Sequence, residues 1–73
     1  MTIDTRQQKL ALWLRQQRQA RNMTMRDVAA ILDRPHSFIG KIEKCERRVE
    51  VAEFIDYCER LGFDALAGFR AAL

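Results

Sequence analysis

Residues 24–48 read TMRDVAAILDRPHSFIGKIEKCERR, and the first half of this stretch carries the signals of a short helix with a defined start. Thr24 and Asp27 have the spacing of a capping box, with Asp in place of the usual Glu or Gln, so we expect a helix over 25–32. Its apolar residues recur at helical spacing and are expected to face a core: Val28, Ala29 and Leu32.

The segment Asp33-Arg34-Pro35 breaks this helix, and a second helix follows. Proline lacks an N–H and suits the first turn of a helix, where that donor has no acceptor within the helix, so we expect a helix over 35–44. The connection between the two helices, Asp33-Arg34-Pro35, is only three residues long and includes the first residue of the second helix. Such a short connection is typical of the steep crossing in a helix-turn-helix unit.

The second helix combines an apolar stripe with a high density of cations. Ile39 and Ile42 are expected to point into the core, yet six of the fifteen residues in 34–48 are basic and only two are acidic. A narrow stripe flanked by cations fits insertion into a DNA groove, where Lys can donate to guanine and Ser can donate or accept. Since residues three and four apart share a helix face, the outward stripe consists of His36, Gly40, Lys44 and Arg47, with Ser37 and Lys41 beside it.

The remaining chain is also predicted to be helical, because no alternating strand pattern or hairpin signal is present. Thr5 can cap a first helix, Asn22 and Gly62 suit left-handed helix ends, and Asp64 can cap a last helix. The predicted fold class is therefore all-α, one domain over 1–73 with five short helices at about 5–21, 25–32, 35–44, 50–61 and 64–73. Further core residues are expected from the first and fourth helices: Leu10, Trp13, Leu14, Val51, Phe54, Ile55, Cys58 and Leu61.

The composition, 48% hydrophobic and 32% charged, is that of a globular domain. No apolar run approaches the roughly 18 residues of a membrane span, and the start MTIDTRQQ lacks the apolar core of a signal peptide, so a cytoplasmic location is expected. Cys45 and Cys58 accompany a single His, too few ligands for a structural zinc site. Neither a metal nor a cofactor is expected, and both thiols are interpreted as reduced, with redox sensing as the alternative.

Charge is distributed unevenly along the chain. Residues 1–48 carry eleven Lys/Arg against five Asp/Glu, a balance of +6, whereas residues 49–73 carry two against five, a balance of −3. This asymmetry favours a basic surface that binds a polyanion. A chance imbalance on a solvated surface is the alternative.

The segment 14–65 resembles the lambda-repressor/Cro-like (XRE-type) family of helix-turn-helix regulators. The resemblance is carried, in order, by Arg18 and Arg21, Met23-Thr24, Val28-Ala29, RPHSFIGKIEKCERR and VAEFIDYCERLG. It implies a lambda-repressor-like DNA-binding domain in which the helix over 35–44 is the recognition helix in the major groove of double-stranded DNA.

The resemblance also implies a role for individual residues. Base contacts are expected from His36, Ser37 and Lys41, with Gly40 allowing close approach of the backbone. Phosphate contacts are expected from the backbone at Met25 and from Lys44, Arg47 and Arg48. The unsatisfied N–H groups at the start of the second helix independently predict a phosphate contact at Met25 and Arg26. Arg18 and Glu43 match a structural ion pair between the first and third helices.

Two positions depart from the family pattern. Asp33 and Cys45 stand where the family usually has Gly in a left-handed backbone. Asp accepts that conformation tolerably but Cys does so poorly, so the loop after the third helix is expected to follow a different path.

The predicted function is a sequence-specific DNA-binding regulator, a dimeric repressor that reads a palindromic operator. A homodimer doubles the number of base contacts and requires half-sites about 34 Å apart. Its interface is expected on the last helix because of the apolar side chains Phe63, Leu66, Phe69 and Leu73. The alternative is that these residues only complete the core of the monomer.

A second class of function is a protein-interaction module, such as an antitoxin or a polymerase-contacting regulator, with DNA binding secondary. An enzyme is not expected, because a single His without a carboxylate cluster, a nucleophile–base pair or a cofactor loop provides no catalytic group. No small-molecule substrate is expected either.

Overall fold

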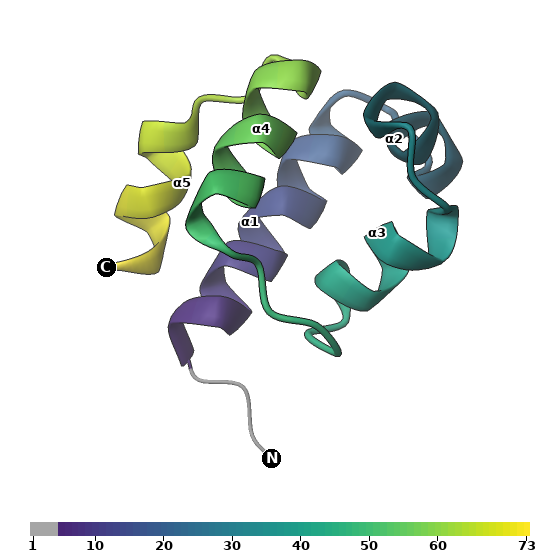
Figure 1. The fold of residues 1–73 in the computed structure, drawn as a ribbon. Coiled ribbons are helices and arrows are strands. Elements are labelled where there is room, and N and C mark those ends of the chain that lie inside the picture. Colours follow the sequence, from purple (N-terminus) through teal and green to yellow (C-terminus); the bar gives the residue numbers. More distant parts are fainter. Residues whose placement is uncertain (1–4) are drawn as a thin grey trace.

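The computed structural model describes residues 5–73, which form five α-helices joined by short turns (Figure 1). The all-α class with five helices that the sequence predicts is confirmed, and α2 and α3 form the helix-turn-helix unit. The helices are α1 Thr5–Ala20, α2 Met25–Leu32, α3 His36–Glu43, α4 Val51–Leu61 and α5 Ala65–Ala72.

Local geometry explains where the helices begin and end. At the start of α2 the Asp27 N–H donates to Thr24 Oγ1 at 3.1 Å and the Thr24 N–H donates to Asp27 Oδ2 at 2.8 Å, so the predicted capping box is present. Asn22, Asp33 and Gly62 follow helices with φ of 55°, 55° and 73°. This left-handed backbone stops a helix, because it turns the chain away from the helical path.

The start of α3 differs by one residue from the expectation. Pro35 is the residue before the helix, with an extended ψ of 147°, and the helix runs over 36–43 rather than 35–44. His36 and Ser37 consequently occupy the first turn, where backbone N–H groups have no acceptor within the helix. Both side chains are exposed at this end of α3.

Helix α1 lies at the centre of the arrangement and packs against both α3 and α5. In Figure 1 the helix-turn-helix unit lies at the right and α5 at the left, so these two parts occupy opposite sides of the molecule. Arg6 and Lys9 of α1 donate to the carbonyl oxygens of Ala72 and Leu73 at 3.2 and 3.4 Å. These contacts satisfy carbonyls at the end of α5 that have no partner within the helix.

An aromatic cluster joins α1, α4 and α5. The ring centroid of Trp13 lies 5.8 Å from that of Phe54 and 6.1 Å from that of Phe63, and Phe54 also meets Phe69 at 5.0 Å. Tilted and edge-on contacts of this kind add to the free energy gained from burial alone. The core residues predicted for the first three helices are all buried: Leu10, Trp13, Leu14, Val28, Ala29, Leu32, Ile39 and Ile42.

The buried face of α4 differs from the expectation. Val51 and Ile55, predicted as core, are 63% and 38% exposed, whereas Tyr57 is buried together with Phe54 and Cys58. The inward face therefore begins at Phe54 and repeats at three and four residues from it. The apolar pattern that begins at Val51 in the sequence includes residues of this buried face and residues of the exposed face beside it.

The predicted dimer interface is wrong at Phe63. This side chain is only 5% exposed, and the Arg21 guanidinium lies 4.5 Å above its ring centroid. Phe63 thus completes the monomer core at the turn between α4 and α5. Leu66 and Leu73 are 64% and 81% exposed, while Phe69 is partly buried.

Gly68 lets α5 pack directly against the aromatic cluster. A Cβ at this position would lie 2.5 Å from Phe54 Cζ and 2.9 Å from Trp13 Cζ3. Both rings are enclosed in the core, so neither can move aside without disturbing other contacts. The absence of a side chain at Gly68 sets the distance between α5 and the rest of the fold.

We predict that Gly68→Ala lowers the free energy of unfolding by about 1–3 kcal/mol, because overpacking outweighs the higher helix propensity of Ala. The matched control is Gly40→Ala, in which the new Cβ meets only Met25 Sδ at 3.9 Å. This control is expected to raise the free energy of unfolding by up to about 1 kcal/mol. Urea denaturation followed by circular dichroism measures both values, and equal effects would contradict the role given to Gly68.

Candidate nucleic-acid interface

A two-point ion pair with α1 holds the C-terminal end of α3. Arg18 Nε donates to Glu43 Oε2 at 2.8 Å and Arg18 Nη2 donates to Glu43 Oε1 at 2.9 Å, the pairing expected from the sequence. The remaining nitrogen, Nη1, donates to the carbonyl of Met23 at 2.9 Å. The hydrogen bond with Glu43 raises the pKa of Arg18, and the two side chains are only 12% and 2% exposed. The positions of α1, α3 and the turn before α2 are therefore fixed relative to one another.

The outward face of α3 borders an open depression. The depression brings together the four residues predicted to contact bases and two of those predicted to contact phosphate, and it adds an acidic residue that the sequence did not indicate. The side chains of His36, Ser37, Lys41 and Lys44 are exposed, and no hydrogen bond or ion pair within residues 5–73 engages them. The lining residues are Met25, His36, Ser37, Gly40, Lys41, Lys44 and Glu46.

The N-terminus of α2 faces the same depression through Met25. The Thr24 side chain accepts from the N–H of Asp27. The N–H groups of Met25 and Arg26 lie in the first turn, where a helix offers no acceptor, and no other acceptor engages them in the described part of the chain. Unsatisfied N–H groups at a helix start, together with the helix dipole, favour an anion such as a phosphate. The side chain of Arg26 is exposed beside them.

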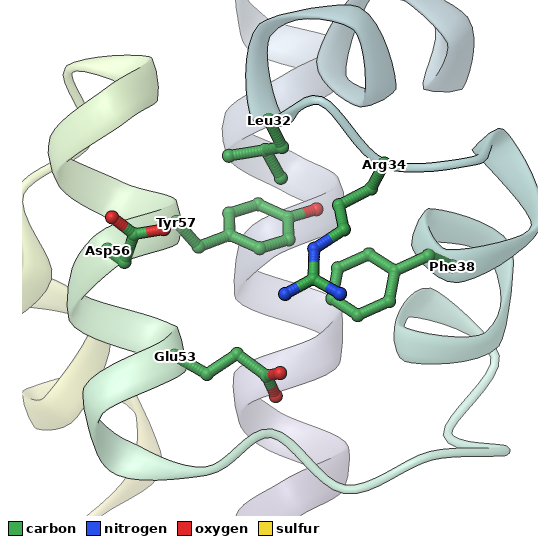
Figure 2. Close-up of a pocket in the computed structure, with 6 residues that line it drawn as sticks. All are labelled: Leu32, Arg34, Phe38, Glu53, Asp56 and Tyr57. Atoms are coloured by element: carbon green, nitrogen blue, oxygen red, sulfur yellow. The ribbon is translucent and has the colours of Figure 1, made fainter.

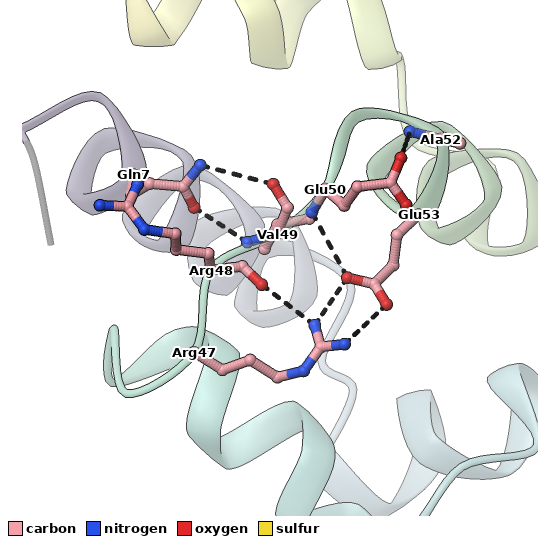
Figure 3. A network of polar contacts seen from close by, with 7 residues as sticks. All are labelled: Gln7, Arg47, Arg48, Val49, Glu50, Ala52 and Glu53. Carbon is pink, nitrogen blue, oxygen red and sulfur yellow. Dashed lines mark hydrogen bonds and ion pairs between the residues drawn. The ribbon is translucent and has the colours of Figure 1, made fainter.

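Figure 3 shows how the loop after α3 is fixed to α1 and α4. Gln7 of α1 binds both polar groups of Val49: its Oε1 accepts from the Val49 N–H at 2.9 Å and its Nε2 donates to the Val49 carbonyl at 3.4 Å. Sequence reasoning missed this residue, since its partner lies 42 positions away and no local pattern connects them. The clamp determines where the end of the loop lies relative to α3.

The structure does not support Arg47 as a phosphate contact. Its Nη1 and Nη2 donate to the Glu53 carboxylate at 2.6 and 2.9 Å, and Nη1 also donates to the carbonyl of Arg48. This ion pair lowers the pKa of Glu53 and raises that of Arg47. Arg47 therefore holds the loop against α4. The exposed side chain of Arg48 lies on the same loop.

Phe38 anchors the other side of α3 to two cations. The guanidinium carbons of Arg34 and Arg47 lie 4.9 and 4.8 Å from its ring centroid, distances typical of cation–π contacts. Figure 2 shows Arg34 beside this ring, with Glu53 extending toward it from α4. The cavity at this place measures about 20 Å³, room for about one water molecule and not for an organic ligand.

Cys45 takes a left-handed backbone with φ of 58°, the conformation for which the family usually has Gly. The expectation that Cys at this position sends the loop along a different path is therefore wrong. Its Sγ lies 3.7 Å from the carbonyl oxygen of Gln7, which places the thiol against α1. Burial raises the pKa of the Cys45 thiol, and it raises the pKa of Cys58 to about 11. Both shifts disfavour the thiolate, the form that reacts with oxidants.

Residues 5–73 contain neither a cluster of metal ligands nor a membrane-spanning helix. No three side chains of His, Cys, Asp or Glu gather as the ligands of a metal ion would. No helix over the same range combines the length and the apolar character needed to cross a bilayer. The depression on α3 brings together the exposed residues His36, Ser37 and Lys41 with Lys44 and Glu46.

Comparison with known proteins matches residues 9–67 to a helix-turn-helix domain. Among solved structures, the chain is similar to an XRE-family like protein from Pseudomonas syringae pv. tomato str. DC3000. The two share 40% sequence identity and superpose with a TM-score of 0.81, over 92% of this chain and 82% of the other. No significant match was found among curated proteins. Both similarities agree with the unit formed by α2 and α3.

The backbone at Cys45 generates a prediction about stability. A left-handed residue with a Cβ costs about 1–2 kcal/mol relative to Gly, so Cys45→Gly should be more stable than Cys45→Ala by about 1 kcal/mol. Both variants lose the thiol, and they differ only in the Cβ that clashes with the backbone. Thermal and urea denaturation measure the difference. A more stable Ala variant would show that the loop relaxes out of the left-handed conformation.

Proposed function

Because the chain belongs to the XRE-like family of helix-turn-helix DNA-binding domains, we propose that it is a sequence-specific transcriptional regulator that reads the major groove with α3. The observation that carries this proposal is the contrast between the two faces of α3. Ile39 and Ile42 are sealed in the core, while polar side chains on the outward face have no partners within residues 5–73.

The first turn of α3 supplies the base contacts in this proposal. A helix enters the major groove with its N-terminal residues on base edges, and His36 and Ser37 occupy that turn. Lys41 extends the same face and can donate to the guanine O6 and N7. Gly40 lies between these residues and leaves room for a close approach of the backbone, since only Met25 Sδ lies near its missing Cβ.

Phosphate contacts surround this reading face. The uncharged N–H groups of Met25 and Arg26 at the start of α2 can donate to a phosphate, and Lys44 adds a positive charge at the end of α3. Arg48 remains a predicted contact on the following loop, whereas Arg47 is assigned to the ion pair with Glu53. These contacts position the protein without reading the sequence.

The division of roles can be tested with duplexes selected by the purified protein from a randomised library. Lys44→Ala should weaken binding to all sequences and reduce the salt dependence by about one charge. Lys41→Ala and Ser37→Ala should instead cost about 1–3 kcal/mol at the selected site and relax discrimination there. Fluorescence anisotropy at two salt concentrations separates these effects. Uniform loss with all three variants would count against the assignment.

We also propose that the regulator acts as a dimeric repressor on a palindromic operator. Leu66 and Leu73 of α5 are exposed, and α5 lies on the side of the molecule away from α3, so pairing through α5 leaves the reading face open (Figure 1). The domain measures 28 × 25 × 21 Å, so two adjoining copies can place their recognition helices about 34 Å apart, one turn of DNA.

The interface on α5 predicts that Leu66→Glu and Leu73→Glu convert the dimer to a monomer, because a charge in an apolar interface must be desolvated. Affinity for the selected palindrome should fall at least tenfold, while a single half-site should be bound as before. Leu12→Glu, at a leucine of α1 that is 54% exposed, is the matched control. Analytical ultracentrifugation gives the oligomeric state. A monomeric unsubstituted protein, or equal effects from all three variants, would refute this interface.

A further inference from the structure

Glu46 occupies the reading face without having been expected there. Its side chain lines the depression formed with His36, Lys41 and Lys44. Its backbone N–H donates to the carbonyl of Lys41 at 2.8 Å, which fixes the loop position of Glu46 relative to α3. The exposed carboxylate therefore belongs to the same surface as the predicted base contacts.

The carboxylate of Glu46 has no structural partner. Glu43 is paired with Arg18 and Glu53 with Arg47, whereas no hydrogen bond or ion pair holds the Glu46 side chain in the part of the chain that the structure describes. Lys44 lines the same depression without pairing with it. A role in holding the fold therefore does not account for this negative charge on a basic face.

The chemistry of a carboxylate restricts what Glu46 can bind in DNA. An ionised carboxylate only accepts hydrogen bonds, so it gains nothing from phosphate oxygens and is repelled by their charge. In the major groove the hydrogen-bond donors are the exocyclic amino groups, N4–H₂ of cytosine and N6–H₂ of adenine. Every base pair carries one such group, on the adenine of A·T or the cytosine of G·C, so the Glu46 carboxylate is compensated only where adenine or cytosine lies on the strand that faces it.

We propose that Glu46 is a specificity-determining residue, which accepts a hydrogen bond from the amino group of a cytosine or adenine at the edge of the site and lowers the affinity for DNA with guanine or thymine in that place. This inference rests on the proposed function, because it requires α3 to enter the groove. It assigns to Glu46 two effects of opposite sign: a contribution to binding at the selected site and a penalty at other sequences.

The test compares Glu46→Gln and Glu46→Ala with the unsubstituted protein on two probes. One probe is a 30-base-pair duplex that the unsubstituted protein selects from a randomised library, and the other is a scrambled duplex of the same composition. Glu59→Gln is the matched control, since it removes the same charge from an exposed residue of α4 outside the depression. Thermal denaturation of each variant verifies that the fold is retained.

Removal of the Glu46 charge should raise affinity for the scrambled duplex about threefold to tenfold and steepen its salt dependence by about one charge. The ratio of selected to scrambled affinity should fall at least fivefold, as expected for the loss of one base contact. A second selection with Glu46→Ala should lose the preference for cytosine or adenine at one position of each half-site. Glu59→Gln should alter neither the ratio nor the selected sequence.

The outcomes separate this inference from the function on which it rests. Equal changes in affinity for both probes, with the selected sequence unchanged, would overturn the role of Glu46 and leave the regulator intact. Failure of the unsubstituted protein to enrich any sequence would instead contradict the proposed function. Loss of preference at one position, together with tighter binding to the scrambled duplex, would support Glu46 as a determinant of specificity.

Discussion

The ion pair between Arg18 and Glu43 is the contact on which the presentation of α3 depends. Helix α3 has only eight residues, too few to be stable in isolation, so its direction is imposed by what it packs against. Ile39 and Ile42 bury its inner face, but apolar contacts alone permit rotation and sliding. The two parallel hydrogen bonds of the buried pair fix the direction of α3. Loss of either partner would leave an uncompensated buried charge, at a cost of about 3–5 kcal/mol.

The structure divides the basic residues of the chain between two tasks. Arg47 pairs with Glu53, Arg34 lies against Phe38, and Arg6 supports the end of α5, so these cations maintain the fold. Lys41 and Lys44 remain without partners within residues 5–73. The net positive charge of the first two-thirds of the chain therefore overstates the charge available to DNA. The contacts of each side chain show which cations remain available.

The sequence predicted those features that depend on local signals or on the family resemblance, which is confirmed. The capping box at Thr24, the ends of α2 and the inward face of α3 follow from residues a few positions apart. The fold could not be predicted where distant segments decide the outcome. Phe63 is buried because the turn before α5 directs it inward, and the Gln7 clamp joins residues 42 positions apart. Glu46 was missed because an isolated acidic residue in a basic loop has no pattern of its own.

Within residues 5–73, three residues other than glycine adopt a left-handed backbone, and all three lie at the ends of the helices of the helix-turn-helix unit. Asn22 precedes α2, Asp33 separates α2 from α3, and Cys45 follows α3. The left-handed backbone strains Cys45 more than Asn22 or Asp33, whereas α1, α4 and α5 are held together by the aromatic cluster. Local unfolding should therefore begin in α2 and α3, and amide hydrogens there should exchange with solvent before those of the aromatic core. A ligand that spans both helices would close the most easily opened part of the domain.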